Sequence, residues 1–333
     1  MDDTKLSASK IFPGCPELGH LTTHSGESWS EFRKTLKPKY AIVWRDILCC
    51  HLMILLSPVL IAVMHHTQGE NMAWVLAPMA ALWMGYWMQA LLNFGHEALH
   101  HNIAPNKKMN DVLANLLIFS LIGLDVKWSR QYHWTHHLNL GNTQDSEVSY
   151  HNRLTPLFLL QTLTGIYFLK SIIPYIYDNK KEHSTKQVKQ GESLRRYTAL
   201  IRALVLHSSI ITASLYFQCY ALVATWLVGA FLFYPAFLAL RQIVEHSSPD
   251  AKAGTNFKEE DYGIVNRLFH PGLLSLTFGT AGFDKHAIHH WDPSISYTRF
   301  SEMENFFMDS VLKEQLDNYR CSYMQTFFKL FKS

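Results

Sequence analysis

The stretch that decides the fold reads MAWVLAPMAALWMGYWMQALLNFGHEALHH and runs from Met72 to His101. From Met72 to Phe94 its residues are almost all apolar, and three of its last six residues are histidines. A helix needs about 20 residues to cross a hydrocarbon core about 30 Å thick. The stretch therefore predicts a membrane-spanning helix that delivers histidines to one edge of the bilayer.

Three further runs have the same character. They are Ile47 to Met64, Leu200 to Gln218 and Ala221 to Leu240. A single soluble core cannot enclose several helices that are apolar all round. The chain is also 48% hydrophobic and only 17% charged, whereas soluble domains have about a quarter charged residues. We expect an all-α, multi-pass membrane protein with four transmembrane helices in two hairpins.

Charged residues indicate how these hairpins are oriented. Neither His65 to Asn71 nor the turn near Cys219, which join the runs within each pair, contains Lys or Arg. The outer flanks of the pairs do contain them: Arg33, Lys34, Lys37, Lys39, Arg45, Lys107, Lys108, Arg195, Arg196, Arg241 and Lys252. By the positive-inside rule, both termini and the segments between the hairpins are expected in the cytoplasm, where they form a helical cap.

Two shorter or interrupted apolar segments are expected not to span. Leu157 to Tyr177 contains Lys170 and Pro174, and a fifth crossing would place the histidine segments on opposite sides of the membrane. We therefore expect an interfacial helix there, for which Tyr167, Tyr175 and Tyr177 are suited. Val112 to Leu124 is too short to span and could lie in the same plane.

The chain divides by composition into three parts. Residues 1–46 form a polar N-terminal segment, residues 47–300 a membrane domain with its cap, and residues 301–333 a C-terminal tail. Both outer parts are expected in the cytoplasm. The Lys and Arg total of 30 against 27 Asp and Glu gives no one-signed surface for nucleic acid.

Histidine is the second unusual feature, at 19 of 333 residues. Ten of them gather in four segments, H-E-A-L-H-H, H-W-T-H-H, R-Q-I-V-E-H and H-A-I-H-H: His96, His100, His101, His133, His136, His137, His246, His286, His289 and His290. The pattern H-x-x-H-H would arise by chance only roughly 0.07 times in such a chain. Because residues i, i+3 and i+4 share a helical face, each such segment is expected to present three imidazoles to a single point.

The number of convergent histidines suggests two metal ions. One ion takes about four to six ligands, so nine or ten imidazoles exceed a single coordination shell. The five cysteines show no C-x-x-C spacing, and a sulfur-free, imidazole-rich site is unsuited to magnesium or calcium. Iron working with dioxygen fits better than zinc hydrolysis.

The sequence also offers some support for two other classes of metal-binding protein, a zinc peptidase and a metal transporter. His96 to His100 matches the zinc peptidase motif H-E-x-x-H, in which Glu97 would be the general base. Two further H-x-x-H-H segments and the absence of a separate third-ligand motif argue against it. A metal transporter would place ionisable residues along the spans, which hold few besides Arg202 and His207.

The histidine segments resemble those of the integral-membrane fatty acid desaturase and hydroxylase superfamily. His96 to His100, His133 to His137 and His286 to His290 match its three boxes in order, and Glu245-His246 resembles its additional histidine. The resemblance covers about Ile47 to Trp291. It implies that two irons are held by His96, His100, His133, His136, His137, His246, His286, His289 and His290.

Six further residues are candidates for a place beside the metals. Metal-bound histidines usually donate their other N–H to a carboxylate or carbonyl. The residues near the boxes that could ligate or support the metals are His101, Glu97, Asp145, Gln242, Glu245 and Asp292.

The resemblance implies O2-dependent desaturation of a fatty acyl or other lipid chain. A hydroxylase or ketolase acting on a lipid or isoprenoid chain would use the same centre and is the alternative. Trp83, Met84, Tyr86, Trp87 and Met88 are candidates to line an apolar tunnel. The sequence shows neither a dinucleotide-binding glycine loop nor a cysteine-rich iron–sulfur segment, so a separate ferredoxin, rubredoxin or cytochrome b5 is expected to supply electrons.

Overall fold

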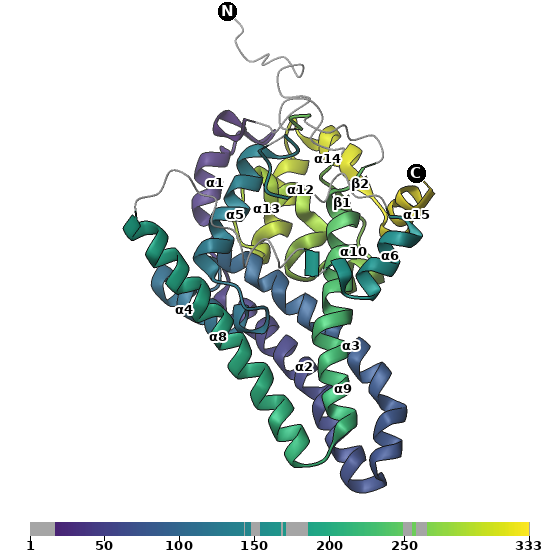
Figure 1. Cartoon of the computed structure of the whole chain (residues 1–333). Coiled ribbons are helices and arrows are strands. Elements are labelled where there is room, and N and C mark those ends of the chain that lie inside the picture. The colour runs from purple at the N-terminus through teal and green to yellow at the C-terminus, as the bar shows by residue number, and fades with distance from the viewer. Residues whose placement is uncertain are drawn as a thin grey trace, which may run out of the picture.

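The computed structural model describes residues 17–142, 144–147, 154–167, 169–170, 186–248, 255–257 and 265–332. Long helices form a bundle at one end of the molecule, and short helices form a cap at the other end (Figure 1). The all-α class is confirmed. The described strands are only β1 (Leu268–Phe269) and β2 (Arg320–Cys321), which pair in parallel.

Among the described residues, four helical segments are long and apolar enough to cross a membrane, as predicted: Tyr40–Gln68, Glu70–Leu99, Gly191–Tyr216 and Tyr220–His246. They correspond to α2 (Tyr40–Gln68), α3 (Glu70–Leu99), α8 (Lys186–Tyr216) and the continuous α9 (Tyr220–Val228), η5 (Gly229–Phe233) and α10 (Tyr234–His246). The second and fourth spans extend beyond the apolar runs towards the cap. This extension carries His96 and His246 out of the apolar layer.

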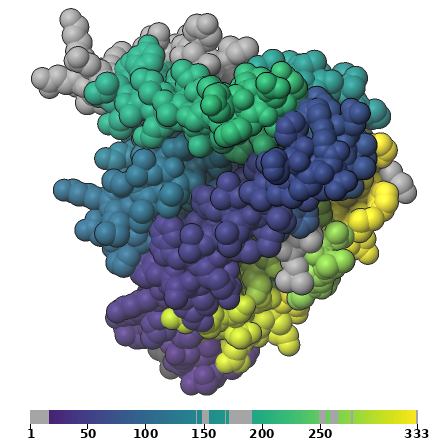
Figure 2. Space-filling view, turned by 90° about the horizontal axis from the view of Figure 1, so that it is seen from below, coloured from purple at the N-terminus to yellow at the C-terminus, as the bar shows by residue number. Residues whose placement is uncertain are grey.

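Each hairpin closes through a residue with positive φ. Gly69 (φ +89°) joins α2 to α3, and Gln218 (φ 55°) lies between α8 and α9. A left-handed residue allows such a reversal within a few residues. Seen from the bundle's far end, the purple-blue hairpin of α2 and α3 lies beside the green hairpin (Figure 2).

The two hairpins approach most closely where glycines face each other. A Cβ added at Gly85 of α3 would lie 2.5 Å from Phe233 Cβ and 2.9 Å from the Gly229 carbonyl oxygen. A Cβ added at Gly229 would lie 3.0 Å from the Ala81 carbonyl oxygen. Small residues at a membrane helix crossing let the backbones come together. The π-helical η5 lies at this crossing, on the path from the apolar bundle to His246.

His207, one of the ionisable residues within the spans, has a structural role. Trp226 Nε1 donates to His207 Nδ1 at 3.0 Å, so His207 Nε2 carries the proton and donates to the Leu121 carbonyl at 3.1 Å. Both ring nitrogens of a neutral imidazole are thereby satisfied within the apolar layer. The side chain links α8 to α9 and to η3 (Phe119–Leu121).

The cap is built from segments far apart in the sequence. Trp29, Ile288, Phe307 and Leu316 share one buried apolar cluster, which joins the N-terminal region to the last histidine segment and the C-terminal region. The remaining elements are η2 (Leu18–His20), α1 (Trp29–Thr35), α4 (Lys107–Leu117), α5 (Val126–Asn139), α6 (Pro156–Leu163), α11 (Leu273–Phe278), η7 (Thr280–Lys285), α12 (His286–Trp291), η8 (Tyr297–Arg299), α13 (Phe300–Met308), α14 (Lys313–Tyr319) and α15 (Tyr323–Lys332). The predicted division at residues 46 and 300 stays a prediction.

The two apolar segments expected not to span contain short helices. Within 157–177, α6 ends at Leu163 and Gly165 has φ +74°, while Tyr175 and Tyr177 lie outside the described residues. Within 112–124, α4 passes into η3, and the chain then bends by 88° into α5. Met109, Val112 and Leu116 of α4 are more than half exposed, as an interfacial helix requires. After the 88° bend, α5, which contains the second histidine segment, runs into the cap.

Candidate two-metal centre

The first histidine segment lies where α3 ends. His96 is in the last turn of α3, and His100 follows the helix directly. His101 then adopts a left-handed conformation (φ 62°), and its N–H donates to the Ala98 carbonyl, a common way to end a helix. His101 is in neither histidine cluster described below; its Nδ1 lies 3.8 Å from Asp111 Oδ1.

Arg130 of α5 fixes this end of α3. Its guanidinium donates to the Leu99 carbonyl at 2.7 Å, the Ala98 carbonyl at 3.0 Å and the Asp111 carboxylate at 2.6 Å. The last carbonyls of a helix lack partners within the helix. A cation that binds them fixes the position of the following residues, here His100.

The second segment is placed by a capped helix. The Asp125 side chain accepts hydrogen bonds from the Lys127 and Trp128 N–H groups and so starts α5. Asn115 Oδ1 accepts from the Val126 N–H and ties this start to α4. Two turns later His133, His136 and His137 are all buried.

The third segment follows a tight reversal. Ala281 and Gly282 of η7 have φ 57° and 78°. A Cβ at Gly282 would lie only 2.6 Å from the Phe300 ring, so glycine is needed for space as well as conformation. The short α12 then presents His286, His289 and His290, all buried.

These residues, with His246 at the end of α10, form two clusters. In each cluster the ligand atoms lie within 4.8 Å of one another. The first cluster contains His96, His100, His133, His137 and His289, and the second contains His136, His246, His286 and His290. All nine predicted ligands are brought together in these two groups.

The expectation that each H-x-x-H-H segment meets a single point is wrong. His133 and His137 point into the first cluster, but His136 belongs to the second. In the third segment His286 and His290 share the second cluster, and His289 belongs to the first. The reason is the helical rotation of about 100° per residue: positions i and i+4 differ by about 40°, whereas i+3 and i+4 differ by about 100°. Each i, i+4 pair therefore serves one cluster, and the i+3 histidine serves the other.

The Nε2 atoms converge within each cluster. In the first, His133 Nε2 lies 3.1 Å from His100 Nε2 and 2.8 Å from His137 Nε2. In the second, His286 Nε2 lies 2.8 Å from His246 Nε2 and 3.0 Å from His290 Nε2. A neutral imidazole has only one N–H group. The Nε2 atoms that face each other in a cluster therefore cannot all be satisfied by hydrogen bonds to one another.

Outward contacts of Nδ1 set the tautomer of three rings. His136 Nδ1 lies 3.1 Å from Asp145 Oδ1, His133 Nδ1 lies 3.5 Å from Glu147 Oε1, and His246 Nδ1 donates to the Val265 carbonyl at 3.0 Å. A proton held at Nδ1 leaves the Nε2 lone pair free to point inward.

Glu147 is a contact that sequence reasoning missed. Burial by itself would raise its pKa, but the neighbouring His136 and the hydrogen bond from His133 bring that pKa well below its ordinary value. Glu147 therefore stays ionised near neutral pH. The available signal was weak: Asp145 was singled out for its place after the second segment, and Glu147 lies two residues further along the same loop.

Burial also keeps the histidines neutral. It lowers the pKa of His100, His137, His286, His289 and His290 well below the ordinary value, and the surrounding histidines lower each further. Neutral imidazole is the form that binds a metal.

The other acidic candidates have different partners. Glu97 Oε2 accepts the Tyr297 N–H at 3.2 Å, Glu245 lies 3.2 Å from Arg241, and the Asp292 carboxylate accepts from Arg33. Each carboxylate is buried beside a histidine segment. Glu97 and Asp292 connect their segments to distant parts of the chain, whereas Glu245 pairs with a residue of its own helix, α10. Gln242 is half-buried in α10, one turn before His246.

The residues present fit two metal ions. Neither ring nitrogen of His96 has a hydrogen-bond partner among the described residues, although both are buried. Such a group is costly unless something binds it. A cation in the first cluster would bind one ring nitrogen of His96 together with the converging Nε2 atoms of the other histidines. Imidazole nitrogens without sulfur suit transition metals such as iron, zinc or copper.

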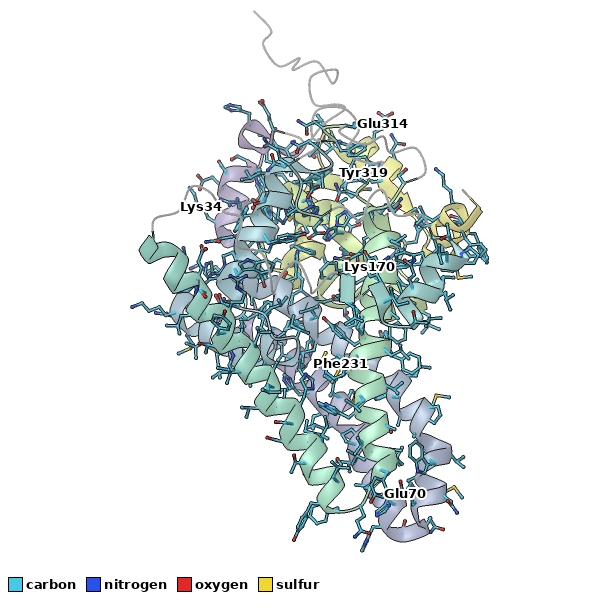
Figure 3. The ribbon with its side chains drawn as sticks, in the orientation of Figure 1. Lys34, Glu70, Lys170, Phe231, Glu314 and Tyr319 are labelled. Atoms are coloured by element: carbon cyan, nitrogen blue, oxygen red, sulfur yellow. The ribbon has the colours of Figure 1, made fainter. Side chains whose placement is uncertain are left out.

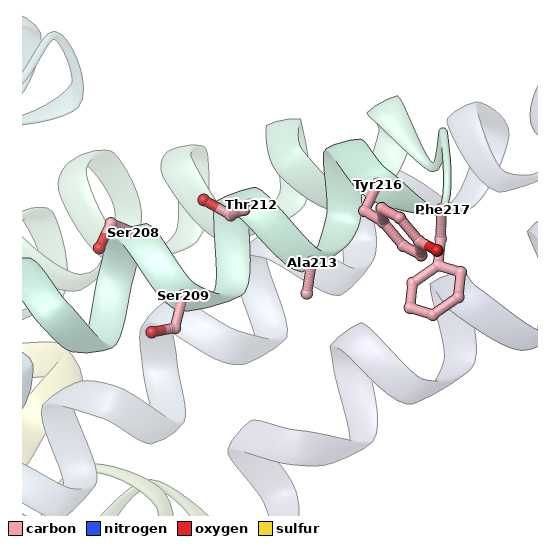
Figure 4. Close-up of a pocket in the computed structure, with 6 residues that line it drawn as sticks. All are labelled: Ser208, Ser209, Thr212, Ala213, Tyr216 and Phe217. Carbon is pink, nitrogen blue, oxygen red and sulfur yellow. The ribbon is translucent and has the colours of Figure 1, made fainter.

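A groove elsewhere on the surface lacks such chemistry. It has a volume of about 470 Å³ and opens on the outer side of α8 (Figure 4); its lining is Ser208, Ser209, Thr212, Ala213, Tyr216 and Phe217. No histidine, cysteine or acid lines it. The clusters are thus the better candidate for the reaction site.

Comparison with known proteins agrees with this geometry. Residues 72–327 match the family model described as fatty acid desaturase. No curated protein matches the chain significantly. The matched region begins in α3, ends in α15 and includes all nine histidines of the two clusters. The chain therefore belongs to the fatty acid desaturase family, a family of oxidoreductases with histidine-box metal sites.

Proposed function

We propose that this protein is an O2-dependent desaturase of a fatty acyl chain, with one iron in each histidine cluster. The observation that carries the proposal is the division of nine imidazoles, eight buried and that of His96 half-buried, into groups of five and four. Two irons held there would supply, with dioxygen, the oxidant needed to remove hydrogen from an unactivated C–H bond.

The protein's own residues prepare the site. His133, His136 and His246 present Nε2 because Glu147, Asp145 and the Val265 carbonyl hold their Nδ1 protons. Burial of the remaining histidines excludes bulk water, which protects reactive species from side reactions.

The apolar region next to the clusters supports a lipid substrate. A small cavity of about 10 Å³ lies between α3, η3 and α10 and is lined by Met88, Leu91, Leu92, Ile118, Leu121, Ile122 and Tyr234. Met84 and Met88 are buried, whereas Trp83 is 42% exposed and faces outward. We infer that an acyl chain enters along the buried side of α3, displacing flexible side chains such as Met88.

The electron donor is proposed to be a separate ferredoxin, rubredoxin or cytochrome b5. Desaturation removes two hydrogens from the substrate and reduces dioxygen to two waters, which requires two further electrons and two protons. The charges flanking the spans favour a cytoplasmic cap, where such donors are found.

The test is product analysis in a host cell that makes the protein. Mass spectrometry of the lipids should show acyl chains that have lost two hydrogens, and the purified protein should contain two irons. A product that has gained oxygen would instead establish the hydroxylase or ketolase alternative.

Variants connect the product to the clusters. His136→Gln and His289→Gln each remove one ligand, from the second and first cluster respectively, and should abolish product while the protein still inserts in the membrane. His24→Gln, at an exposed histidine of the N-terminal region, is the matched control and should retain activity. Product formation by either cluster variant would contradict the proposed ligand set.

A further inference from the structure

A third group of metal-ligating side chains lies at the opposite end of the bundle. His65 is in the last turn of α2, Glu70 is the first residue of α3, and Cys219 directly precedes α9. One ligand atom from each lies within 4.8 Å of the others. Figure 3 shows Glu70 at the end of the bundle furthest from the cap. The group is therefore separate from the two histidine clusters.

Glu70 already connects the two hairpins. Its Oε2 lies 2.6 Å from His65 Nδ1, and its Oε1 accepts the Ala221 N–H at 2.8 Å. One carboxylate thus contacts the end of α2 and the start of α9, on different hairpins. These contacts place the carboxylate beside both other ligand types.

The thiol of Cys219 is buried at the same point. Cys219 is only 3% exposed, and its N–H donates to the Ser214 carbonyl at 2.9 Å, which fixes the turn. The Leu222 N–H, in the first turn of α9, faces the sulfur. Burial raises the pKa of the Cys219 thiol and the Leu222 N–H only partly offsets this, so the thiol keeps its proton until a metal ion displaces it.

The three donors suit zinc. Imidazole nitrogen, carboxylate oxygen and thiolate sulfur are its usual ligands, whereas magnesium and calcium prefer oxygen alone. Zinc bonds of roughly 2.0–2.3 Å place ligand atoms roughly 3.3–3.8 Å apart, which small side-chain rotations achieve from the present spacing. His65 and Glu70 are each about one quarter exposed, so an ion can enter from the aqueous side and keep a water as fourth ligand.

We propose that His65, Glu70 and Cys219 bind one zinc ion that fastens the two hairpins together at the membrane face opposite the histidine clusters. The ion displaces the thiol proton and the hydrogen bond between His65 and Glu70. Its role is structural, because no residue of the site contacts the histidine clusters.

Cobalt spectroscopy of the purified full-length protein tests the site directly. A thiolate bound to Co²⁺ gives a near-ultraviolet charge-transfer band, and neither histidine cluster contains sulfur. We expect this band in the unaltered protein and its loss in Cys219→Ser. Cys49→Ser, at a half-buried cysteine in α2, is the matched control and should keep the band. Absence of the band in the unaltered protein, or its persistence in Cys219→Ser, would overturn the proposal.

Zinc content and thermal stability give an independent measurement. Zinc should be retained by His66→Gln, at the exposed neighbouring histidine, and lost in His65→Gln and Glu70→Gln. Chelation should lower the Tm of the unaltered protein by roughly 2–4 °C more than that of Glu70→Gln, because any effect at the histidine clusters is common to both proteins. Equal effects of the chelator on both proteins would overturn the proposal and show that Glu70 joins the hairpins through its hydrogen bonds alone. None of these readouts depends on turnover, so the result is separable from the proposed desaturase activity.

Discussion

At the scale of single residues, the orientation of three of the imidazoles, those of His133, His136 and His246, depends on a partner of Nδ1 outside the clusters. His133 and His136 each face a carboxylate from the loop that follows α5, Glu147 and Asp145 respectively. Asp145 also accepts the Gly141 N–H at 2.7 Å, so the loop and the ligand are fixed together. The two acids thus set both the tautomer and the position of the second histidine segment.

Replacing Glu147 tests this dependence. Glu147→Gln keeps the size of the side chain but removes the charge beside His133, so metal occupancy and turnover should fall by roughly 10–100-fold. Iron content and kcat should fall together, with KM for the substrate little changed. Glu27→Gln, an exposed acid in the N-terminal region, is the control. A variant with full iron and reduced kcat would show that Glu147 acts in some way other than by positioning the ligand.

The nine histidines of the two clusters could be singled out from the sequence because most of them recur at short, local spacings. Residues i, i+3 and i+4 are neighbours on the surface of any helix, so the histidine segments were recognisable without knowing the fold. The division of His136 from His133 and His137 was not recognisable, because it depends on which segments pack against each side of α5. The Glu147, Arg130 and Cys219 contacts were missed for the same reason: each partner comes from a different element.

At the scale of elements, the approach of α3 to the fourth span determines where His96 and His246 lie. Gly85 and Gly229 allow this approach, and the π-helical η5 lies at the crossing. The four predicted apolar runs correspond to the helices that are observed. The point at which these helices cross could not be predicted, because the sequence does not show which glycines lie at a close helix contact.

Gly85→Ala should disturb this crossing. The added Cβ would lie 2.5 Å from Phe233 Cβ and 2.8 Å from the Tyr234 backbone nitrogen, and overpacking of this kind costs about 1–3 kcal/mol. We expect a lower Tm and reduced iron content. Gly191→Ala in α8, where the nearest atom is the end of Arg195 at 3.9 Å, should be neutral or slightly stabilising. Equal Tm values for the two variants would mean that the crossing relaxes without cost.

At the scale of the whole molecule, the cap joins the two ends of the chain to the third histidine segment. Glu304 of α13 shows this: it lies 2.7 Å from Lys285, next to His286, and 2.7 Å from Arg320 of β2. Asp292 and Arg33 make a similar link to the N-terminal region. The residues of the cap core, such as Trp29 and Phe307, could be expected to be buried, but their shared cluster could not be inferred from segments so distant in sequence.

This link predicts a pH dependence of stability. Burial by itself would raise the pKa of Glu304, but the hydrogen bonds from Lys285 and Arg320 bring it below the ordinary value of 4.5. The stabilisation is therefore present above about pH 4.5 and is lost as the pH falls through the lowered pKa of the folded protein. Glu304→Gln should lower the Tm at pH 7 and have a smaller effect at pH 4. Glu314→Gln, at an exposed acid (Figure 3), should change neither value. A pH-independent effect of Glu304→Gln would assign the loss to packing rather than to charge.

The sharing of α5 and α12 between the two clusters has a consequence for assembly. Each of these helices carries histidines of both clusters. An ion bound in one cluster would therefore also fix the orientation of the helices that form the other. The second ion then meets ligands that are already aligned and loses less entropy in ordering them. Loading is therefore expected to be cooperative, with little protein carrying a single ion.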